Sequence, residues 1–406
     1  MGGKDDMKAL LQSVYPDMVQ WRRYLHRHPE LSFHEKETSR WIAEQLQEMG
    51  CEVETGVGGH GLIAKIKGES KGPTVALRAD IDALPIQDEK SCEYTSTVPG
   101  VMHACGHDAH TATMLGIAKY YRSQRHAFSG ERRLLFQPAE ELTPGGALGM
   151  IRDGALRGVD AIYGVHLWTP IPYGIVSSKE GPFMAAPDEI QIDITGQGGH
   201  GGMPHDTIDS IVVGAALVQG IQSIVSRNVD PLQPAVVSIG SFHAGTIGNG
   251  IAERCQLLGT VRTFNEETRD RIRERLETIV NQTAAMYGAA AKLEYRLGYP
   301  PVVNDEEEAR RFFRVAAEQF GGGAVQRSEP IMIGEDFSYY LREKPGCFMF
   351  VGAGNEACGA VYPHHHPKFD LDERAMLQSA ALMIAMAEDY AANHCSLSSN
   401  ASPGTE

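Results

Sequence analysis

The sequence has no long apolar run, no excess of positive charge and no regular framework of cysteines. Its most apolar stretch, Ile211 to Val218, is far shorter than the roughly 20 residues of a transmembrane helix. A net charge of −15 argues against nucleic acid and anionic membranes as partners. Seven scattered cysteines, an odd number, are typical of reduced thiols. Because Met1 to Asp6 contains no apolar segment, we expect no signal peptide and a soluble, cytoplasmic protein.

The chain has 406 residues, which is long enough for two domains. Short β-branched or apolar runs predict strands, and amphipathic runs between them predict helices. The strands are expected at 61–67, 74–77, 134–136 and 161–165, and the helices at 35–49, 108–121 and 146–152. This alternation is typical of an α/β fold with a mostly parallel sheet.

The pattern changes between residues 187 and 297, where strands alternate with period two and two long amphipathic helices lie between them. We therefore expect an α/β catalytic domain (1–186 and 298–394) interrupted by an inserted α+β domain (187–297) that acts as a lid or dimerisation domain. The segment 395–406 is rich in Ser, Pro and Asn and is expected to be a disordered tail.

Polar side chains follow three of the predicted strands. Arg78 to Asp82 comes after the second strand, Gln137 to Glu141 after the third, and His166 after the fourth. Open α/β sheets bind their ligands at the carboxyl ends of the strands. The segment His103 to His110 contributes a thiol and several imidazoles, a combination that suits Zn, Mn, Co or Ni better than Mg or Ca.

Five candidate ligands result: Cys105, His107, Glu141, His166 and one of His364 to His366. Five exceeds the three protein ligands of a typical mononuclear catalytic zinc, so we predict two divalent metal ions that share a bridging ligand. Glu140 remains free to act as a general base. A nucleophilic Cys105 with His107 as its base is the competing mechanism, but it leaves the other candidate ligands unexplained.

The inserted domain carries the glycine-rich segment Gly196 to His205, which has no GK[ST] ending and is therefore no phosphate loop. His200 in this segment is a candidate for polarising a substrate carbonyl. Asn249 and Arg262 are candidates for binding a substrate carboxylate.

Taken together, these motifs resemble the aminoacylase–carboxypeptidase superfamily of dinuclear metallohydrolases, in particular its amidohydrolase branch of N-acyl amino acid, hippurate and auxin-conjugate hydrolases. The resemblance covers nearly the whole chain. It rests on the segments 21–31, 78–85, 102–110, 137–141, 164–166, 196–205 and 365–370.

The resemblance implies that Cys105 is a bridging thiolate and that His107, Glu141, His166 and His365 complete two metal sites. It implies a general base at Glu140, oxyanion stabilisation by His200, which can come from a neighbouring subunit, and an orienting role for Asp82. Asp80 stands where the peptidase branch has a metal-binding histidine. Asn249 and Arg262 match less distinctive surroundings.

The expected activity is hydrolysis of the amide bond of N-acyl L-amino acids by a homodimer or higher homo-oligomer. A metallocarboxypeptidase or dipeptidase is the alternative within the same class. A catalytically inactive metal-binding relative is the alternative from another class, and the complete set of ligands together with Glu140 argues against it.

Overall fold

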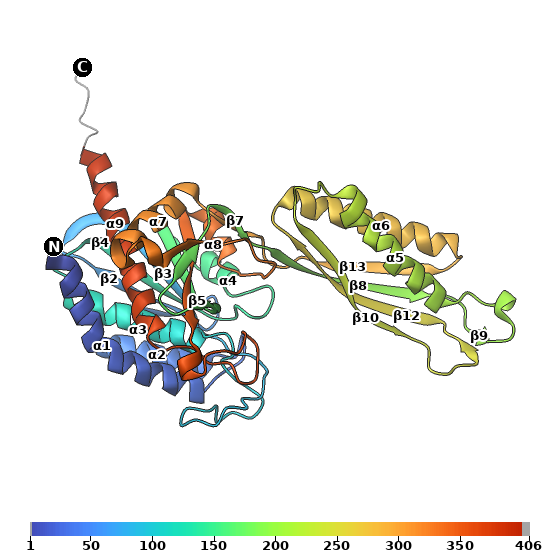
Figure 1. Ribbon diagram of the computed structural model, residues 1–406, viewed down its shortest axis with the longest axis horizontal. Helices are drawn as coiled ribbons and strands as arrows, with labels where there is room; N and C mark the ends of the chain where they lie inside the picture. Colours follow the sequence, from blue (N-terminus) through green and yellow to red (C-terminus); the bar gives the residue numbers. More distant parts are fainter. Residues whose placement is uncertain (1, 400–406) are drawn as a thin grey trace, which may run out of the picture. The chain divides into compact units, whose positions relative to one another are not determined.

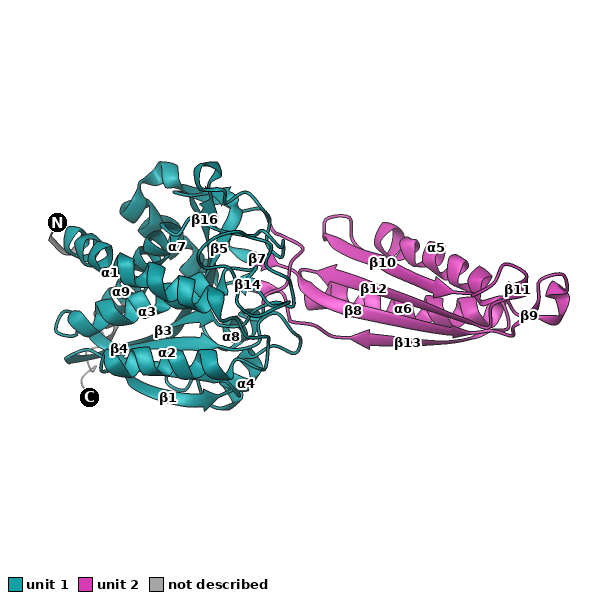
Figure 2. Ribbon diagram, turned by 90° about the horizontal axis from the view of Figure 1, so that it is seen from below, with its two compact units in different colours: residues 1–181, 303–329, 336–406 teal, residues 182–302, 330–335 magenta. Residues whose placement is uncertain are grey.

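The computed structural model describes residues 2–399, with side chains described from residue 4 to residue 393. The chain forms two compact units (Figure 2). Unit 1 comprises Met1–Gly181, Val303–Glu329 and Asp336–Glu406, and unit 2 comprises Pro182–Val302 and Pro330–Glu335. The short segment Pro330–Glu335 thus groups with the inserted unit, whereas the sequence pattern had placed it in the first domain.

Unit 1 is built on an eight-stranded sheet in the order β1-β2-β4-β3-β5-β16-β6-β15. Figure 1 labels its strands β2, β3, β4 and β5. The central strands β4, β3, β5 and β16 are parallel, which confirms the expected α/β class. The strands of this sheet are β1 (Glu52–Val57), β2 (Gly61–Lys67), β3 (Ser70–Asp80), β4 (Ser129–Gln137), β5 (Ala161–Pro172), β6 (Val176–Ser178), β15 (Val325–Arg327) and β16 (Gly346–Gly354).

The helices of unit 1 are α1 (Gly2–Arg27), α2 (Lys36–Glu48), α3 (His107–Ser123), α4 (Ala147–Arg152), α7 (Glu306–Phe320), α8 (Ser338–Glu343) and α9 (Ala375–Ser399). Helices α3 and α9 pack on the central strands, and α1 packs on both of these helices. A single apolar core joins them to the sheet. Helix α9 includes Cys395 to Ser399, which the sequence had assigned to a disordered tail, whereas residues 400–406 lie outside the described part of the chain.

Unit 2 contains a fully antiparallel sheet in the order β10-β12-β8-β13. Its strands are β8 (Ala186–Thr195), β10 (Ala235–Ala244), β12 (Arg254–Thr263) and β13 (Ala290–Arg296). Helices α5 (Ser210–Asn228) and α6 (Glu266–Met286) bury an apolar core against this sheet. The edge strand β13 was not predicted, because its half-exposed sequence AAKLEYR has only a weak apolar pattern.

Four further short strands complete the fold. The connections between the units contain β7 (Gly181–Met184) and β14 (Val302–Asn304), and the glycine-rich segment of unit 2 contains β9 (Gly199–His200) paired with β11 (Gly250–Ile251). Short 3-10 turns lie at Pro204–Asp206, Gly322–Ala324 and Glu356–Cys358.

Helix α5 differs from the expectation that no segment approaches a membrane span. Its 19 residues are long and apolar enough to cross a membrane by length and composition alone. However, Val213, Leu217, Ile221 and Ile224 are buried in the core of unit 2. This arrangement is typical of an amphipathic core helix.

Candidate metal centre and catalytic residues

The candidate site of unit 1 is formed where β3, β4 and β5 carry polar residues and where α3 begins. Gly106, the N-cap of α3, has φ 94°, a left-handed conformation that suits glycine. The chain turns at this residue between Cys105 and His107, and the side chains of both are buried. The sequence had placed the first residue of the helix one position later, at Asp108.

A first group of potential ligand atoms comes from Cys105, His107 and Glu141, all within 4.8 Å of one another. His107 Nε2 lies 3.8 Å from Glu141 Oε1. Both of these atoms are buried, and neither has a hydrogen-bond partner. Buried polar atoms are normally satisfied, so two unsatisfied donor atoms facing each other fit a site that binds a cation.

A second group is formed by Cys105, His166 and His364, with the same distance limit. Cys105 Sγ lies 3.4 Å from His166 Nε2, and the other ring nitrogen of His166, Nδ1, lies 2.9 Å from the carbonyl oxygen of Leu167. This contact assigns the proton to Nδ1 and leaves Nε2 free to bind a metal. The buried Nδ1 of His364 also has no hydrogen-bond partner.

His365, the ligand that the resemblance implies, lies beside the first group. Its Nε2 is 3.4 Å from Glu141 Oε1, and its backbone has a left-handed φ of 65°. The neighbouring His364 stacks on Trp168 with the ring centroids 4.4 Å apart. The structure therefore brings two histidines of the triplet to the site, where the sequence argument required only one.

The donor set fits divalent metal ions of borderline softness. Cys105 belongs to both groups, as a bridging ligand must. The part of the site around His107 also favours positive charge: although burial lowers the pKa of His107, Asp80 and Asp82 outweigh this effect and raise it to about 10. At His166, by contrast, burial and the neighbouring imidazoles hold the pKa well below its usual value. A buried site that stabilises a cation, and whose nitrogen, sulfur and oxygen donors converge, is suited to metal binding.

Asp82 orients both His107 and Glu141. Its Oδ1 lies 3.1 Å from His107 Nδ1, and its Oδ2 accepts hydrogen bonds from the backbone N–H of Glu141 at 3.0 Å and from the Ser32 hydroxyl at 2.7 Å. Burial raises the pKa of Asp82, but the hydrogen bond and charge of His107 hold it below its usual value. A carboxylate in this position fixes the tautomer of the metal-binding imidazole.

Asp80 is held in a separate set of contacts. It accepts a hydrogen bond from Arg78 at 2.6 Å, and its Oδ1 lies 2.6 Å from His110 Nδ1. Burial works against ionisation, but His107, Arg78 and His110 keep the pKa of Asp80 well below its usual value. Asp80 therefore contributes negative charge near His107 while its own oxygens are occupied by Arg78 and His110.

Glu140, the candidate general base, is 8% exposed and follows directly after Ala139, which has a left-handed φ of 51°. Burial raises the pKa of the Cys105 thiol well above its usual value, and the charges of Glu141 and Glu140 add to this effect. The two glutamates thus lie near the same sulfur, with Glu141 in the ligand group and Glu140 next to it in the chain.

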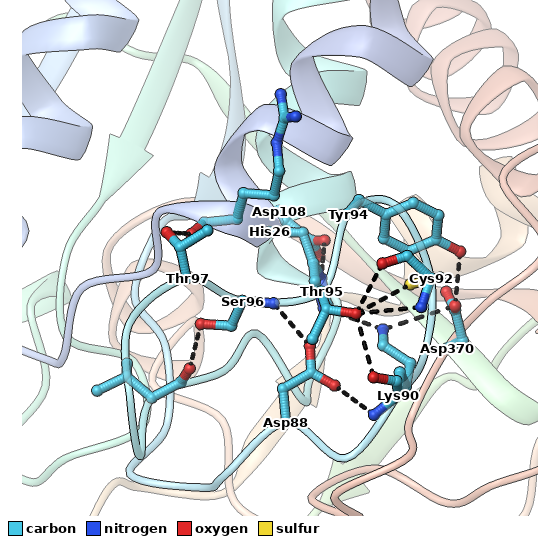
Figure 3. Close-up of polar contacts among 12 residues, drawn as sticks. His26, Asp88, Lys90, Cys92, Tyr94, Thr95, Ser96, Thr97, Asp108 and Asp370 are labelled. Atoms are coloured by element: carbon cyan, nitrogen blue, oxygen red, sulfur yellow. Dashed lines mark hydrogen bonds and ion pairs between the residues drawn. The ribbon is translucent and has the colours of Figure 1, made fainter.

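A network of charged residues holds the start of α3. Asp108 Oδ2 lies 2.7 Å from His26 Nδ1 (Figure 3). The same oxygen accepts a hydrogen bond from Arg22 at 2.9 Å. Arg22 also donates to Asp370 at 2.8 Å, and Asp370 accepts a hydrogen bond from Tyr94 at 2.7 Å. Arg22 therefore connects the segment after His107 to the segment that follows the histidine triplet.

The remaining candidates lie in unit 2, at two different places. His200 pairs with Gly250 between β9 and β11, and the backbone N–H of Gly201 donates to the carbonyl oxygen of Asn249 at 2.8 Å. These strands adjoin the Arg254 end of β12, because Gly196 N–H donates to the carbonyl of Glu253. Arg262 lies eight positions further along β12, about 26 Å away at the usual rise of a strand.

Several residues of the site were given no individual role from the sequence: Ser32 opposite Asp82, Glu35 beside Ala139, and Arg22, His26, Asp108, His110 and Asp370. Ser32 and Glu35 are common polar residues outside the motif segments, so their sequence signal is weak. The others lie within segments 21–31, 102–110 and 365–370, and the family resemblance of these segments was the signal that could have found them.

Comparison with known proteins decides the family. Residues 76–389 match the model of peptidase family M20/M25/M40. The chain belongs to this family. The resemblance noted from the sequence motifs is confirmed, and so is the α/β fold with an inserted α+β domain that the strand and helix pattern predicted.

The chain is 47% identical over 304 residues to a protein of Geobacillus stearothermophilus named N-acyl-L-amino acid amidohydrolase, covering 75% of this chain and 82% of the relative. It is 39% identical over 385 residues to thermostable carboxypeptidase 1 of Saccharolobus solfataricus, covering 94% and 97%. The structure of the Bacillus subtilis YXEP protein, described as a dinuclear metal binding peptidase from M20 family, superposes with a TM-score of 0.81 at 36% identity, covering 94% and 99%. Members of this family are hydrolases, and this chain shares the fold of the YXEP protein over 94% of its length.

Proposed function

We propose that the protein hydrolyses the amide bond of N-acyl L-amino acids, releasing a carboxylic acid and the free amino acid. The observation that carries the proposal is the pair of ligand groups that share Cys105. Glu140 directly precedes Glu141 in the chain, and its charge adds to the burial that raises the pKa of the Cys105 thiol. The relative named N-acyl-L-amino acid amidohydrolase supports the choice of substrate.

The ligands would be Cys105, shared by both ions, together with His107, Glu141, His166 and His365, with His364 as the alternative for the last position. When bound, two divalent ions at this site would polarise the substrate carbonyl and lower the pKa of a water molecule. Mn, Zn, Co and Ni all suit a donor set of thiolate, imidazole and carboxylate.

In this mechanism Glu140 accepts a proton from the attacking water as the new C–O bond forms at the acyl carbon. The C–N bond then breaks, and Glu140 passes the proton to the departing amine nitrogen, so that it returns to its ionised state. Asp82 takes no proton: it holds the imidazole of His107 and the backbone of Glu141 in place.

His200 would donate a hydrogen bond to the oxyanion, and Arg262 would bind the α-carboxylate of the substrate. Asn249 lies beside His200 and not beside Arg262, so it would reach the substrate only together with His200. Arg262 lies about 26 Å along β12 from the Arg254 end, which adjoins the segment of His200, so the two side chains are poorly placed to contact one small substrate within the same copy, and we assign them to different copies. We therefore favour a homo-oligomer in which His200 acts on the site of a neighbouring subunit. The exposed Ile211 and Val212 on α5 provide an apolar surface for such contacts.

We place the enzyme in the cytoplasm, because the cysteines in the described part of the chain are all free thiols: Cys51, Cys92, Cys105, Cys255, Cys347 and Cys358.

A metallocarboxypeptidase is the second candidate function, and the relative named thermostable carboxypeptidase 1 supports it.

The test is a release assay for free amino acids with the metal-loaded enzyme. N-acetyl, N-benzoyl and N-indoleacetyl amino acids represent the proposed substrates, and dipeptides with a free N-terminus represent the alternative. Preferential cleavage of the N-acyl amino acids supports the proposal. Cleavage of the dipeptides alone would assign the protein to the peptidases instead.

A further inference from the structure

The segment between α1 and α2, residues 28–35, contacts the residues that follow β3 and β4, two of the strands that carry the site. The proposed mechanism assigns this segment no role. The backbone N–H of Ala83 donates to the carbonyl oxygen of Glu30 at 2.8 Å, and Leu31 forms a parallel bridge with Ala83. The Ser32 hydroxyl donates to Asp82 in the same region. This segment is therefore fixed against the end of β3.

Glu35 at the end of this segment has a fully buried side chain. Its Oε1 accepts two backbone hydrogen bonds, from the N–H of Phe33 at 3.0 Å and from the N–H of Ala139 at 2.8 Å. Its Oε2 is buried without a hydrogen-bond partner. One carboxyl oxygen thus joins the α1–α2 connection to the segment that follows β4.

The two backbone positions that Glu35 holds have an unusual conformation. Phe33 has φ 65° and Ala139 has φ 51°, and the third described non-glycine residue with positive φ is His365. A left-handed conformation is unfavourable for an alanine, and it persists only where neighbouring groups impose it. For Ala139, that neighbouring group is the carboxyl of Glu35, which accepts a hydrogen bond from the backbone N–H of Ala139.

Glu35 does not serve its own helix. It occupies the N-cap position of α2, but its side chain forms no capping hydrogen bond. That role is taken by Glu30, which accepts hydrogen bonds from the backbone N–H groups of Thr38 at 2.7 Å and Glu37 at 3.2 Å. Burying a carboxyl group near the charge of Asp82 is unfavourable for folding, and the Glu35 side chain does not offset this by capping α2. Its contact with Ala139 therefore calls for another explanation.

We propose that Glu35 is the positioning residue for the catalytic base: it holds the left-handed turn at Ala139 and thereby fixes the direction of Glu140. The inference rests on the proposed role of Glu140. Without the acceptor, Ala139 relaxes toward an ordinary conformation and the carboxylate of the next residue shifts. A displacement of about 1 Å at a reacting group is enough to cost about a hundredfold in rate.

The test compares Glu35→Leu and Glu35→Gln in the metal-loaded enzyme. Leucine removes the acceptor, and we expect kcat to fall about 10- to 100-fold with KM within about threefold and the metal content unchanged. Glutamine keeps an acceptor oxygen at the same place, so most of kcat should return. Glu30→Gln is the matched control, since Glu30 also accepts two backbone N–H bonds but faces α2, and it should leave kcat unchanged.

Two further measurements separate positioning from mere stabilisation. Glycine adopts left-handed conformations freely, so Ala139→Gly introduced into Glu35→Leu should restore part of kcat. Hydrogen exchange at the amide of Ala139 should accelerate in Glu35→Leu but not in Glu30→Gln. If Glu35→Leu is too unstable to purify, Glu35→Asp takes its place, because the shorter side chain keeps the carboxylate but withdraws the acceptor from the Ala139 N–H. Faster exchange at the Ala139 amide with a lower kcat supports the positioning role, and faster exchange with normal kcat overturns it.

Glu140→Gln, measured in parallel, distinguishes the two proposals. If Glu140→Gln is fully active, the assignment of the base is wrong. If Glu140→Gln is inactive while Glu35→Leu retains normal kcat and merely melts at a lower temperature, Glu35 is a structural residue and the positioning role is overturned. Loss of metal from Glu35→Leu would also overturn it, because the defect would then lie in the ligands.

Discussion

Cys105 Sγ lies 3.4 Å from His166 Nε2, and the same sulfur belongs to the group formed with His107 and Glu141. A shared ligand makes the two proposed sites interdependent. We expect about two metal equivalents per chain in the wild-type protein, since the two groups supply ligands for two ions. Cys105→Ser should weaken both sites, whereas His166→Ala should weaken one, as measured by elemental analysis after dialysis.

Equal metal losses in Cys105→Ser and His166→Ala would contradict the bridging role of the thiolate. A wild-type protein that is fully active with one equivalent would contradict the dinuclear site as a whole.

The neighbouring glutamates should respond differently to the same substitution. Glu140→Gln should keep both metals and lose about 10²–10⁴-fold in kcat, which is the usual contribution of a general base. Glu141→Gln should lose metal as well as activity, because Glu141 Oε1 is an unsatisfied atom of the first ligand group. Metal content and kcat measured on the same preparations check this, and similar behaviour of the two variants would refute the division of roles.

Substitutions can show which histidine of the triplet, His364 or His365, binds the metal. The motif resemblance favours His365, whereas the structure places His364 with Cys105 and His166. If His365 is the ligand, His365→Ala should lose about one metal equivalent, and His364→Ala should keep both while losing the stacking contact with Trp168. The reverse pattern would make His364 the ligand.

Action of His200 across subunits predicts complementation. Co-expression of His200→Ala chains with Glu140→Gln chains should produce mixed oligomers in which one site combines an intact Glu140 with a partner's intact histidine. For a dimer, random mixing should restore about a quarter of the wild-type activity. Each variant alone should be inactive with its metals bound, and no recovery in the mixture would place His200 in the site of its own subunit.

Glu35 should make stability depend on pH. Burial, aided by the negative charge of Asp82, raises the pKa of Glu35 from 4.5 to about 7. Below pH 4.5 the group is neutral in both the folded and the unfolded states. As the pH rises toward 7, the unfolded chain ionises while the folded protein retains its proton, so the folded state is progressively penalised.

The variant Glu35→Gln has no titratable proton at this position, so its side chain contributes no such pH dependence. Its free energy of unfolding relative to wild type should therefore increase between about pH 4.5 and 7 and level off above, by up to about 3 kcal/mol, since one pKa unit corresponds to about 1.4 kcal/mol. Urea unfolding at several pH values with equal metal load measures the difference. A difference independent of pH would show that Glu35 ionises equally in both states.

Much of the site could be predicted from sequence because its ligands follow strands or lie in one short loop. Polar residues after β3 and β4, and His166 within β5, belong to parallel strands whose carboxyl ends meet at one edge, so their convergence follows from strand order alone. The pair Cys105 and His107 is local, and Gly106 between them provides the turn. The period-two pattern of the inserted unit identified β8, β10 and β12 for the same reason, whereas β13, half exposed at the edge, gave too weak a signal.

The tertiary structure alone decided the contacts between residues that are far apart in the chain and that no periodicity links. Glu35 meets Ala139 across 104 positions, and Arg22 joins Asp108 to Asp370 across 86 and 348 positions. The separation of Arg262 from His200 also depends on strand register in unit 2, which the sequence pattern did not specify. The sequence determined which chemical groups are available and which strands carry them. The packing of α1, its following loop and α3 determined how those groups are oriented, because orientation depends on long-range hydrogen bonds that form only in the folded chain.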